Sequence, residues 1–344
     1  MEPVTHVLAS LAIAQAAKKQ LPRYGAWMIV VAGVAADLDY ASYFGGAEFF
    51  LKFHRTALHS LAGSAMMCCA VAGAFCFLDR RHKKASTSKP DALPPLRFLA
   101  ALAACALGAA GHLLLDVASG IGVQFLWPFR MHWTAWDLAT NLDPWILLIL
   151  LAGLLLPQLF RLVSEEIGDK KSGARGRGGA IFALLLICAY FGMRAYSHSE
   201  AVGLLLSREI RGRESLSGGA FPFSSTPFDW RGVAVTDTTI EVVGVPTGGS
   251  EEFEPDNSLT RFKPEDSPAL EAAQDTADAQ EFLKYARIPI ASVVKVEDDY
   301  RVEIRDARFT GANPGLDDIF VRVDLDSAAH VKKQQFRFAS DTGP

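Results

Sequence analysis

The chain has 344 residues, of which 50% are hydrophobic and 21% are charged, and its formal net charge is −4. This length is enough for two domains. The slightly acidic balance gives no reason to expect nucleic-acid binding, which relies on basic surfaces. The apolar runs precede residue 200, whereas much of the acidic charge follows it. We therefore predict an all-α polytopic membrane helix bundle over residues 1–200 and a small, mostly β extramembrane domain over residues 201–344.

Six apolar segments are expected to form the helices of the membrane domain, because about 20 apolar residues cross a bilayer as a helix. The first segment is short, and Lys18 and Lys19 follow it rather than precede it, which is the wrong order for a signal peptide. We expect it to be a retained helix. Pro157 should kink or shorten the fifth segment. The six segments cover residues 4–17, 26–36, 58–78, 98–117, 144–162 and 180–196.

Lysines and arginines gather in alternate loops of this domain. Lys18, Lys19 and Arg23 follow the first segment, and further basic residues occupy 80–97 and 161–177. Loops rich in lysine and arginine stay in the cytoplasm, so the sixth segment should end on the outer side. We expect a multi-pass protein of the bacterial inner membrane with its C-terminal domain on the periplasmic side.

A histidine-bearing stretch stands at the start of the third apolar segment, where His54 and His59 flank Arg55. Polar side chains beside lipid are costly unless they pair, bind a ligand or catalyse. The charge-derived topology, which does not use these residues, places other histidines and aspartates on the same outer side. His112 and Asp116 are four residues apart and share one helix face. The potential ligands are His6, Asp37, Asp39, His54, His59, His112 and Asp116.

These seven residues are the kinds that bind a divalent metal. Imidazole with carboxylate suits zinc best here, with manganese or iron as alternatives. All five cysteines lie in apolar runs without zinc-finger spacing and are expected to be buried small hydrophobic residues. Seven ligands are too many for one ion with an open position, so either two metals bind or some of the groups are catalytic. We predict Arg55, Asp39 and His59 as catalytic residues, with Arg55 stabilising developing charge.

Each candidate also has a structural interpretation. His6 could be an ordinary residue of the first helix, and the two aspartates at 37 and 39 could simply end the second. His54 and His59 could be hydrogen-bonded residues of the interface, and His112 with Asp116 could join two helices as a buried pair. His132 lies among aromatic residues and is expected to anchor the membrane interface. Asp137 and Asp143 could join the site from the outer loop.

The order of these motifs resembles the YdjM-like family. The resemblance rests on Thr5-His6, the 36–39 segment, His54-Arg55-x-x-x-His59-Ser60, His112-x-x-x-Asp116 and the stretch from Gly122 to Phe129, and it covers roughly residues 1–160. Ala36 stands where the family usually has proline. Members are described as LexA-regulated, inner-membrane-associated proteins and are assigned as metal-dependent hydrolases. The resemblance therefore implies that the seven residues form a metal site.

The C-terminal region has the pattern of antiparallel strands. Residues 230–246, 288–309 and 319–331 are rich in β-branched residues, and parts of them alternate between apolar and polar. Residues 197–225 are expected to form a polar connector and 251–278 a long acidic loop, with a short helix over 279–285. No catalytic motif stands out in this domain.

Two functions of different class follow from these features. The first is a membrane-bound metal-dependent hydrolase acting on an ester or phosphoester, of lipid or envelope origin, at the outer face of the inner membrane. The alternative is a non-catalytic membrane protein, either a metal or ion transporter or a scaffold that binds a partner. Transporters bind their ions near the bilayer midplane, whereas these ligands lie at helix ends, which favours the enzyme. The substrate, the number of metals and the oligomeric state stay open.

Overall fold

The computed structural model describes residues 1–85, 95–166, 176–223, 226–249, 252–309 and 318–341. The chain divides into two compact units, and each unit is made of two separate stretches of sequence. The first unit comprises Met1–Asp39 and Arg55–Arg194. The second comprises Tyr40–His54 and Ala195–Pro344, so a short excursion from the N-terminal part belongs with the C-terminal sheets.

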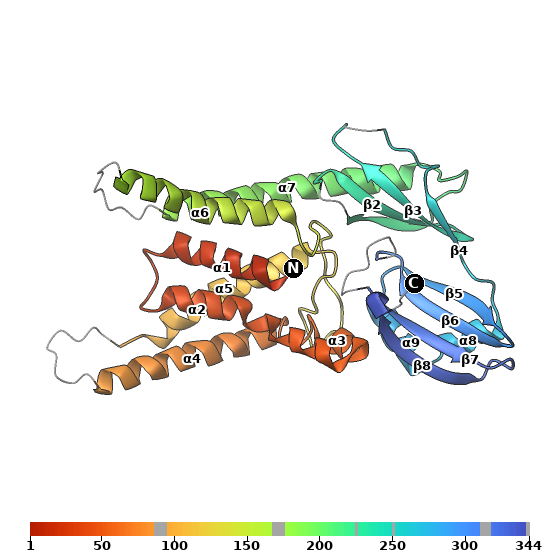
Figure 1. Cartoon of the computed structure of the whole chain (residues 1–344), viewed down its shortest axis with the longest axis horizontal. Coiled ribbons are helices and arrows are strands. Elements are labelled where there is room, and N and C mark those ends of the chain that lie inside the picture. Colours follow the sequence, from red (N-terminus) through yellow and green to blue (C-terminus); the bar gives the residue numbers. More distant parts are fainter. Residues whose placement is uncertain (86–94, 167–175, 224–225, 250–251, 310–317, 342–344) are drawn as a thin grey trace. The chain divides into compact units, whose positions relative to one another are not determined.

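The first unit is a bundle of helices (Figure 1). In it α2 packs against both α5 and α1, α1 also packs against α6, and α4 packs against α5. A 3-10 segment, η1, continues directly from α2. The helices are α1 (Pro3–Ala17), α2 (Gly25–Val34), η1 (Ala35–Gly45), α4 (Leu61–Ala85), α5 (Phe98–Ala118), α6 (Pro144–Glu166) and α7 (Arg177–Ser207), and η1 and α7 continue into the second unit.

The described residues contain four helices long and apolar enough to cross a membrane, not the six expected from the sequence. These spans are Gly25–Gly45, Leu61–His82, Phe98–Ala118 and Arg177–Ser207. Helix α1 has 15 residues, or about 22 Å at 1.5 Å per residue, which is short of the roughly 30 Å hydrocarbon core. The apolar part of α6, Pro144–Phe160, is also shorter than these four spans, although the helix itself has 23 residues and runs on through Pro157.

Two glycines let the central helices of the bundle touch. A Cβ atom on Gly108 of α5 would lie 2.1 Å from the backbone oxygen of Ile29 in α2. A Cβ on Gly33 of α2 would lie equally close, 2.1 Å, to the hydroxyl of Ser10 in α1. Only residues without a side chain permit this approach. The backbones of α2 and α5 therefore touch, and α2 lies directly against the Ser10 side chain of α1, which fixes the positions of the side chains at the ends of these helices.

The cysteines do not all lie in this core. Cys68, Cys76 and Cys105 are buried, as expected, but Cys69 and Cys188 are exposed. The expectation was wrong for these two because an apolar residue on a membrane-spanning helix can face lipid instead of the protein interior.

The second unit contains two four-stranded antiparallel sheets (Figure 1). A cluster that includes Phe221, Val233, Ile240 and Ala307 packs residues of the first sheet against the segment that follows β6. The first sheet consists of β1 (Ser217–Pro222), β2 (Asp229–Val235), β3 (Thr239–Pro246) and β4 (Leu259–Phe262), and the second of β5 (Pro289–Val296), β6 (Asp299–Asp306), β7 (Ile319–Leu325) and β8 (Val331–Phe338).

Several segments expected to be irregular are ordered elements. The connector at 197–225 contains the end of α7, where Ala201 and Leu205 bury against Trp230, and strand β1. The acidic loop at 251–278 contains β4 and helix α8 (Pro268–Gln274). The expected short helix is present as α9 (Ala277–Tyr285). The sequence pattern missed the others because their stability comes from tertiary contacts rather than from local propensity.

The excursion at 40–54 carries a short helix, α3 (Ala47–Phe53), that packs on β8. The ring of Phe338 in β8 lies 5.0 Å from that of Tyr43 and 5.9 Å from that of Phe50. The excursion leaves the first unit after Asp39 and returns at Arg55. The two residues that flank this segment, Asp39 and Arg55, are therefore both predicted site residues.

Candidate metal centre

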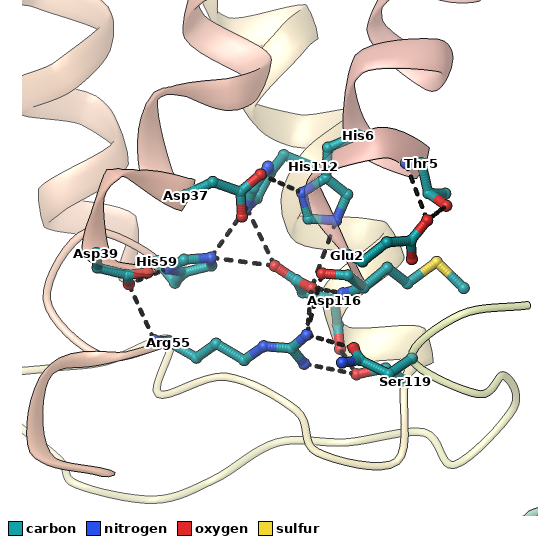
Figure 2. Close-up of polar contacts among 12 residues, drawn as sticks. Glu2, Thr5, His6, Asp37, Asp39, Arg55, His59, His112, Asp116 and Ser119 are labelled. Carbon is teal, nitrogen blue, oxygen red and sulfur yellow. Dashed lines mark hydrogen bonds and ion pairs between the residues drawn. The ribbon is translucent and has the colours of Figure 1, made fainter. Parts of the chain in front are cut away.

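Six of the seven predicted ligands lie in the first unit, and Figure 2 shows them facing one another at the ends of several elements. His6 comes from α1, the aspartates from η1, and His112 with Asp116 from α5, while His59 lies in the loop before α4. The buried set is His6, Asp37, Asp39, His59, His112 and Asp116.

His6 and Asp37 form one side of the centre. Nδ1 of His6 lies 3.1 Å from Oδ2 of Asp37, and the His6 ring centroid lies 3.7 Å from that of His112. Nε2 of His6 and Oδ1 of Asp37 are buried without a hydrogen-bond partner. A buried polar atom without a partner is costly. These two atoms are therefore candidates for coordinating a cation.

Asp116 forms the other side, together with two imidazoles. Its Oδ2 lies 3.2 Å from Nε2 of His59 and 3.1 Å from Nε2 of His112. The two Nε2 atoms are 3.0 Å apart. One ligand atom from each of His59, His112 and Asp116 lies within 4.8 Å of the others, and the same holds for the set of His6, Asp37 and His112. His112 belongs to both sets, so the two sets form one continuous centre.

Close polar partners orient both imidazoles. Nδ1 of His112 lies 2.8 Å from the backbone oxygen of Gly33. A carbonyl can only accept, so this nitrogen carries the proton and Nε2 keeps its lone pair. Nδ1 of His59 lies 2.9 Å from Oδ2 of Asp39. Such partners commonly orient histidines that bind metals. Asp39 is thus placed to orient His59 rather than to contact the shared centre.

Arg55 lies beside the centre and is almost fully buried. Its guanidinium donates to Oγ of Ser119 at 2.8 Å and to Oδ1 of Asn141 at 2.8 Å. It also lies 3.3 Å from Oδ1 of Asp116. Its backbone N–H donates to Asp39 at 3.0 Å. Sequence reasoning missed Ser119 and Asn141, because neither belongs to a motif and only the fold brings their loop to Arg55.

The carboxylates of the centre favour the protonated form of His59. Burial disfavours a charged His59, but hydrogen bonds to Asp116 and Asp39, with the charges of these carboxylates, raise the pKa of His59 to about 9. The amino group of Met1 also forms an ion pair with Asp116. Three aspartates thus bring negative charge to a buried place that also holds three imidazoles, the Arg55 guanidinium and the Met1 amino group.

Three predicted residues are placed differently. The ring of His54 stacks on Phe50 at 4.4 Å and lies 4.3 Å from Tyr40, and all three belong to the second unit. His54 is therefore not among the ligands that the first unit brings together. Asp143 accepts from the hydroxyl of Tyr190 at 3.0 Å and from the first turn of α6, which is a structural role. His132 is exposed.

Comparison with known proteins agrees with the arrangement of motifs. The family profile described as YdjM inner membrane protein matches residues 1–201, which extends beyond the 160 residues of the resemblance and covers α1 to most of α7. No curated protein and no solved structure matches the chain. The chain thus belongs to the YdjM inner membrane protein family, and its apolar helices make it a multi-pass protein of the inner membrane.

Proposed function

We propose that this protein is a membrane-bound metal-dependent hydrolase that acts on an ester or phosphoester at the outer face of the inner membrane. The observation that carries the proposal is the convergence of three imidazoles and two carboxylates, all buried, in two overlapping sets of potential ligands. Buried charges and unpaired polar atoms lower the stability of a fold. They are therefore found mainly where they serve a function.

The ligands that we propose are His6, Asp37, His59, His112 and Asp116. This donor set of nitrogen and carboxylate oxygen fits zinc first, and manganese or iron as alternatives. Five donors suit either one ion or a pair that shares His112 or Asp116. A bound divalent cation would supply Lewis-acid chemistry, which activates water and polarises an ester or phosphoester.

The remaining polar residues have roles that do not require contact with the ion. Asp39 holds the imidazole of His59 through Nδ1 and fixes the backbone of Arg55. Hydrogen bonds to Ser119 and Asn141 hold Arg55, so its guanidinium group is oriented before substrate binds. A preorganised cation of this kind stabilises negative charge that develops on the substrate oxygen.

The outer location follows from the positions of the basic residues. His6 and His112 lie at the ends of α1 and α5 that are remote from Lys18 and Arg97, and His59 precedes α4 whereas Arg80 lies near its far end. Basic loops remain cytoplasmic. This supports a centre on the periplasmic side. The basic residues at 161–177 favour a cytoplasmic end for α6, so that α7 would lead the C-terminal domain back to the periplasmic side.

The first test measures metal in detergent-purified protein by elemental analysis. We expect the wild type to carry a divalent metal and His59→Ala to lose most of it, because mutations at ligands or at their orienting partners lower affinity by about 10–100-fold or more. His82→Ala is the matched control, since His82 is an exposed histidine on α4. Equal metal content in wild type and His59→Ala would contradict the ligand assignment.

The second test addresses turnover with a panel of phosphoesters and lipid esters. Arg55→Lys keeps the positive charge, but a lysine ammonium group cannot donate to both Ser119 and Asn141 in the way that the planar guanidinium group does. We expect it to retain metal and to lose about 100-fold in kcat, the effect typical of removing one preorganised donor. Metal-loaded wild type that hydrolyses no member of the panel would count against the hydrolase.

A further inference from the structure

An apolar groove lies between α6 and α7, on the first unit and apart from the polar centre. Its volume is about 760 Å³, which falls within the roughly 300–1,000 Å³ typical of small-ligand sites. The walls include Leu156, Phe182 and Leu186, and the groove ends near Trp145 and Met193. Its lining contains no charged residue.

Small residues explain why the two helices leave a groove. A Cβ on Gly153 of α6 would lie 2.4 Å from that of Ala183 on α7, and a Cβ on Gly179 would lie 2.4 Å from the Pro157 ring. The backbones therefore touch along this line, as in other packed membrane helices. The larger side chains stand on either side of it and form the walls.

The length of the groove corresponds to one leaflet of a bilayer. From Trp145 to Pro157 the helical rise is about 18 Å, and from Gly179 to Met193 it is about 21 Å. A single leaflet with its headgroup region is roughly 20 Å thick, and a transmembrane helix from a partner needs about 20 residues to cross both leaflets. The groove is thus long enough for a lipid chain and too short to seat a whole partner helix.

One end of the groove has the character of the membrane interface. Trp145 lies there, and the hydroxyl of Tyr190 donates to Asp143 at 3.0 Å. Tryptophan and tyrosine are enriched at the level of the lipid headgroups. Tyr190 also belongs to the same hydrophobic cluster as Met1 and Leu115. Leu115 directly precedes Asp116, so this end of the groove is joined to the polar centre by continuous packing.

We infer that the groove binds one acyl chain of an outer-leaflet lipid and thereby directs the headgroup of that lipid toward the polar centre. The chain is the occupant because α7 is long and apolar enough to cross the membrane, α6 is apolar from Pro144 to Phe160, and the lining offers only apolar contact. That the bound lipid is the substrate rests on the hydrolase function proposed above, whereas binding of the chain does not.

Photo-crosslinking tests the inference in the full-length protein. The protein is reconstituted into phosphatidylcholine nanodiscs that contain phosphatidylethanolamine with a diazirine in its acyl chain, and labelled peptides are identified by mass spectrometry. Labels should concentrate on the groove residues of α6 and α7. Ala189→Phe should reduce this labelling by about tenfold, because the new ring fills the groove. Cys188→Phe is the matched control, since Cys188 is exposed on the same helix outside the groove.

The outcomes test binding of an acyl chain in the groove separately from the proposed hydrolase function. Labels spread evenly over the lipid-facing helices, or equal labelling in the two variants, would overturn acyl-chain binding in the groove. Labels that avoid the groove residues and fall only around them, as a protein helix seated in the groove would cause, would also overturn it. Leu186→Trp repeats the test if Ala189→Phe does not fold. Metal content, measured on the same samples, should equal that of the wild type. Groove-dependent labelling in a protein that hydrolyses no lipid would support the chain site and reject only the substrate assignment.

Discussion

Asp116 is the residue on which most of the polar contacts converge. It faces the imidazoles of His6, His59 and His112 and the guanidinium of Arg55 at distances from 3.1 to 3.5 Å. A carboxylate in such surroundings has its negative charge balanced by several donors rather than by one partner. Its neutral analogue, asparagine, would remove the carboxylate charge that lies 3.3 Å from the guanidinium of Arg55. We regard Asp116 as the residue least open to substitution in this centre.

A second buried aspartate, in the C-terminal unit, gives a pH-dependent prediction. Burial, and secondarily the charge of Asp306, raise the pKa of Asp318 to about 6 from an ordinary value of 3.8, despite the opposing charges of Arg305 and Arg231. The folded state therefore binds the proton more tightly than the unfolded state. The stabilisation from this group is complete below pH 3.8 and is lost as the pH rises through about 6.

Asp318→Asn should remove this loss of stability at neutral pH, because asparagine carries no charge that burial would penalise. At pH 7.5 its Tm should exceed that of the wild type by about 3 °C, the shift expected for roughly 1 kcal/mol in a protein of this size. Near pH 4.5 the difference should shrink, because the wild-type carboxyl is then protonated. Thermal unfolding followed at both pH values measures the effect. A constant difference, or a lower Tm at neutral pH, would contradict the raised pKa.

At the scale of elements, the centre depends on how closely α2 and α5 approach. His112 lies one helical turn after Gly108, and its Nδ1 is bonded to the backbone oxygen of Gly33 on α2. The glycines therefore set both the helix separation and the orientation of a predicted ligand. The helix ends, rather than a loop, carry most of the site, which gives the precision that a metal centre needs.

Gly108→Ala should disturb this approach. Its Cβ would lie 2.1 Å from the oxygen of Ile29, so the helices must move apart at a cost of about 1–3 kcal/mol. We expect lower metal content and a Tm reduced by several degrees. Gly73→Ala on α4 is the matched control, because its Cβ would meet nothing within 4 Å. Equal metal content and Tm in the two variants would show that the contact between α2 and α5 does not position His112.

At the scale of the whole molecule, the excursion at 40–54 joins the two units. It belongs to the second unit, where Tyr43 and Phe50 pack on Phe338, yet its ends are Asp39 and Arg55 of the centre. We expect a change in the packing of the C-terminal sheet to reach Asp39 and Arg55 through the backbone that joins them to this segment. This connection gives the C-terminal domain a physical route to influence the site even though it carries no catalytic motif.

Phe338→Ala should loosen the excursion. The aromatic contacts that hold it to β8 would be lost, so backbone amides within 40–54 should exchange hydrogen faster, while those of α5 should not. Hydrogen-exchange mass spectrometry of the full chain measures both regions. Phe262→Ala is the control, because Phe262 is an exposed phenylalanine of the first sheet. Unchanged exchange over 40–54 would mean that Phe338 does not hold this segment.

The sequence by itself determined the membrane character, the family and six of the residues that meet in the centre. Hydropathy, charge and short motifs are local properties of the sequence. They indicate which residues are buried and on which side of the membrane a loop lies, and neither requires knowledge of the fold. His112 and Asp116 illustrate this, because their four-residue spacing alone places them on one helix face. The sequence also indicated antiparallel strands wherever alternation was clear, as in β6 and β7.

Only the tertiary structure decided the rest. It reduced the spans from six to four, since helix length and not only hydropathy limits crossing. It placed the ring of His54 against Phe50 within the second unit, although His54 is adjacent to Arg55 in sequence. It also brought Ser119, Asn141 and Gly33 to the centre. These contacts join residues far apart in the chain, and their geometry is set by the packing of whole helices, which no local pattern encodes.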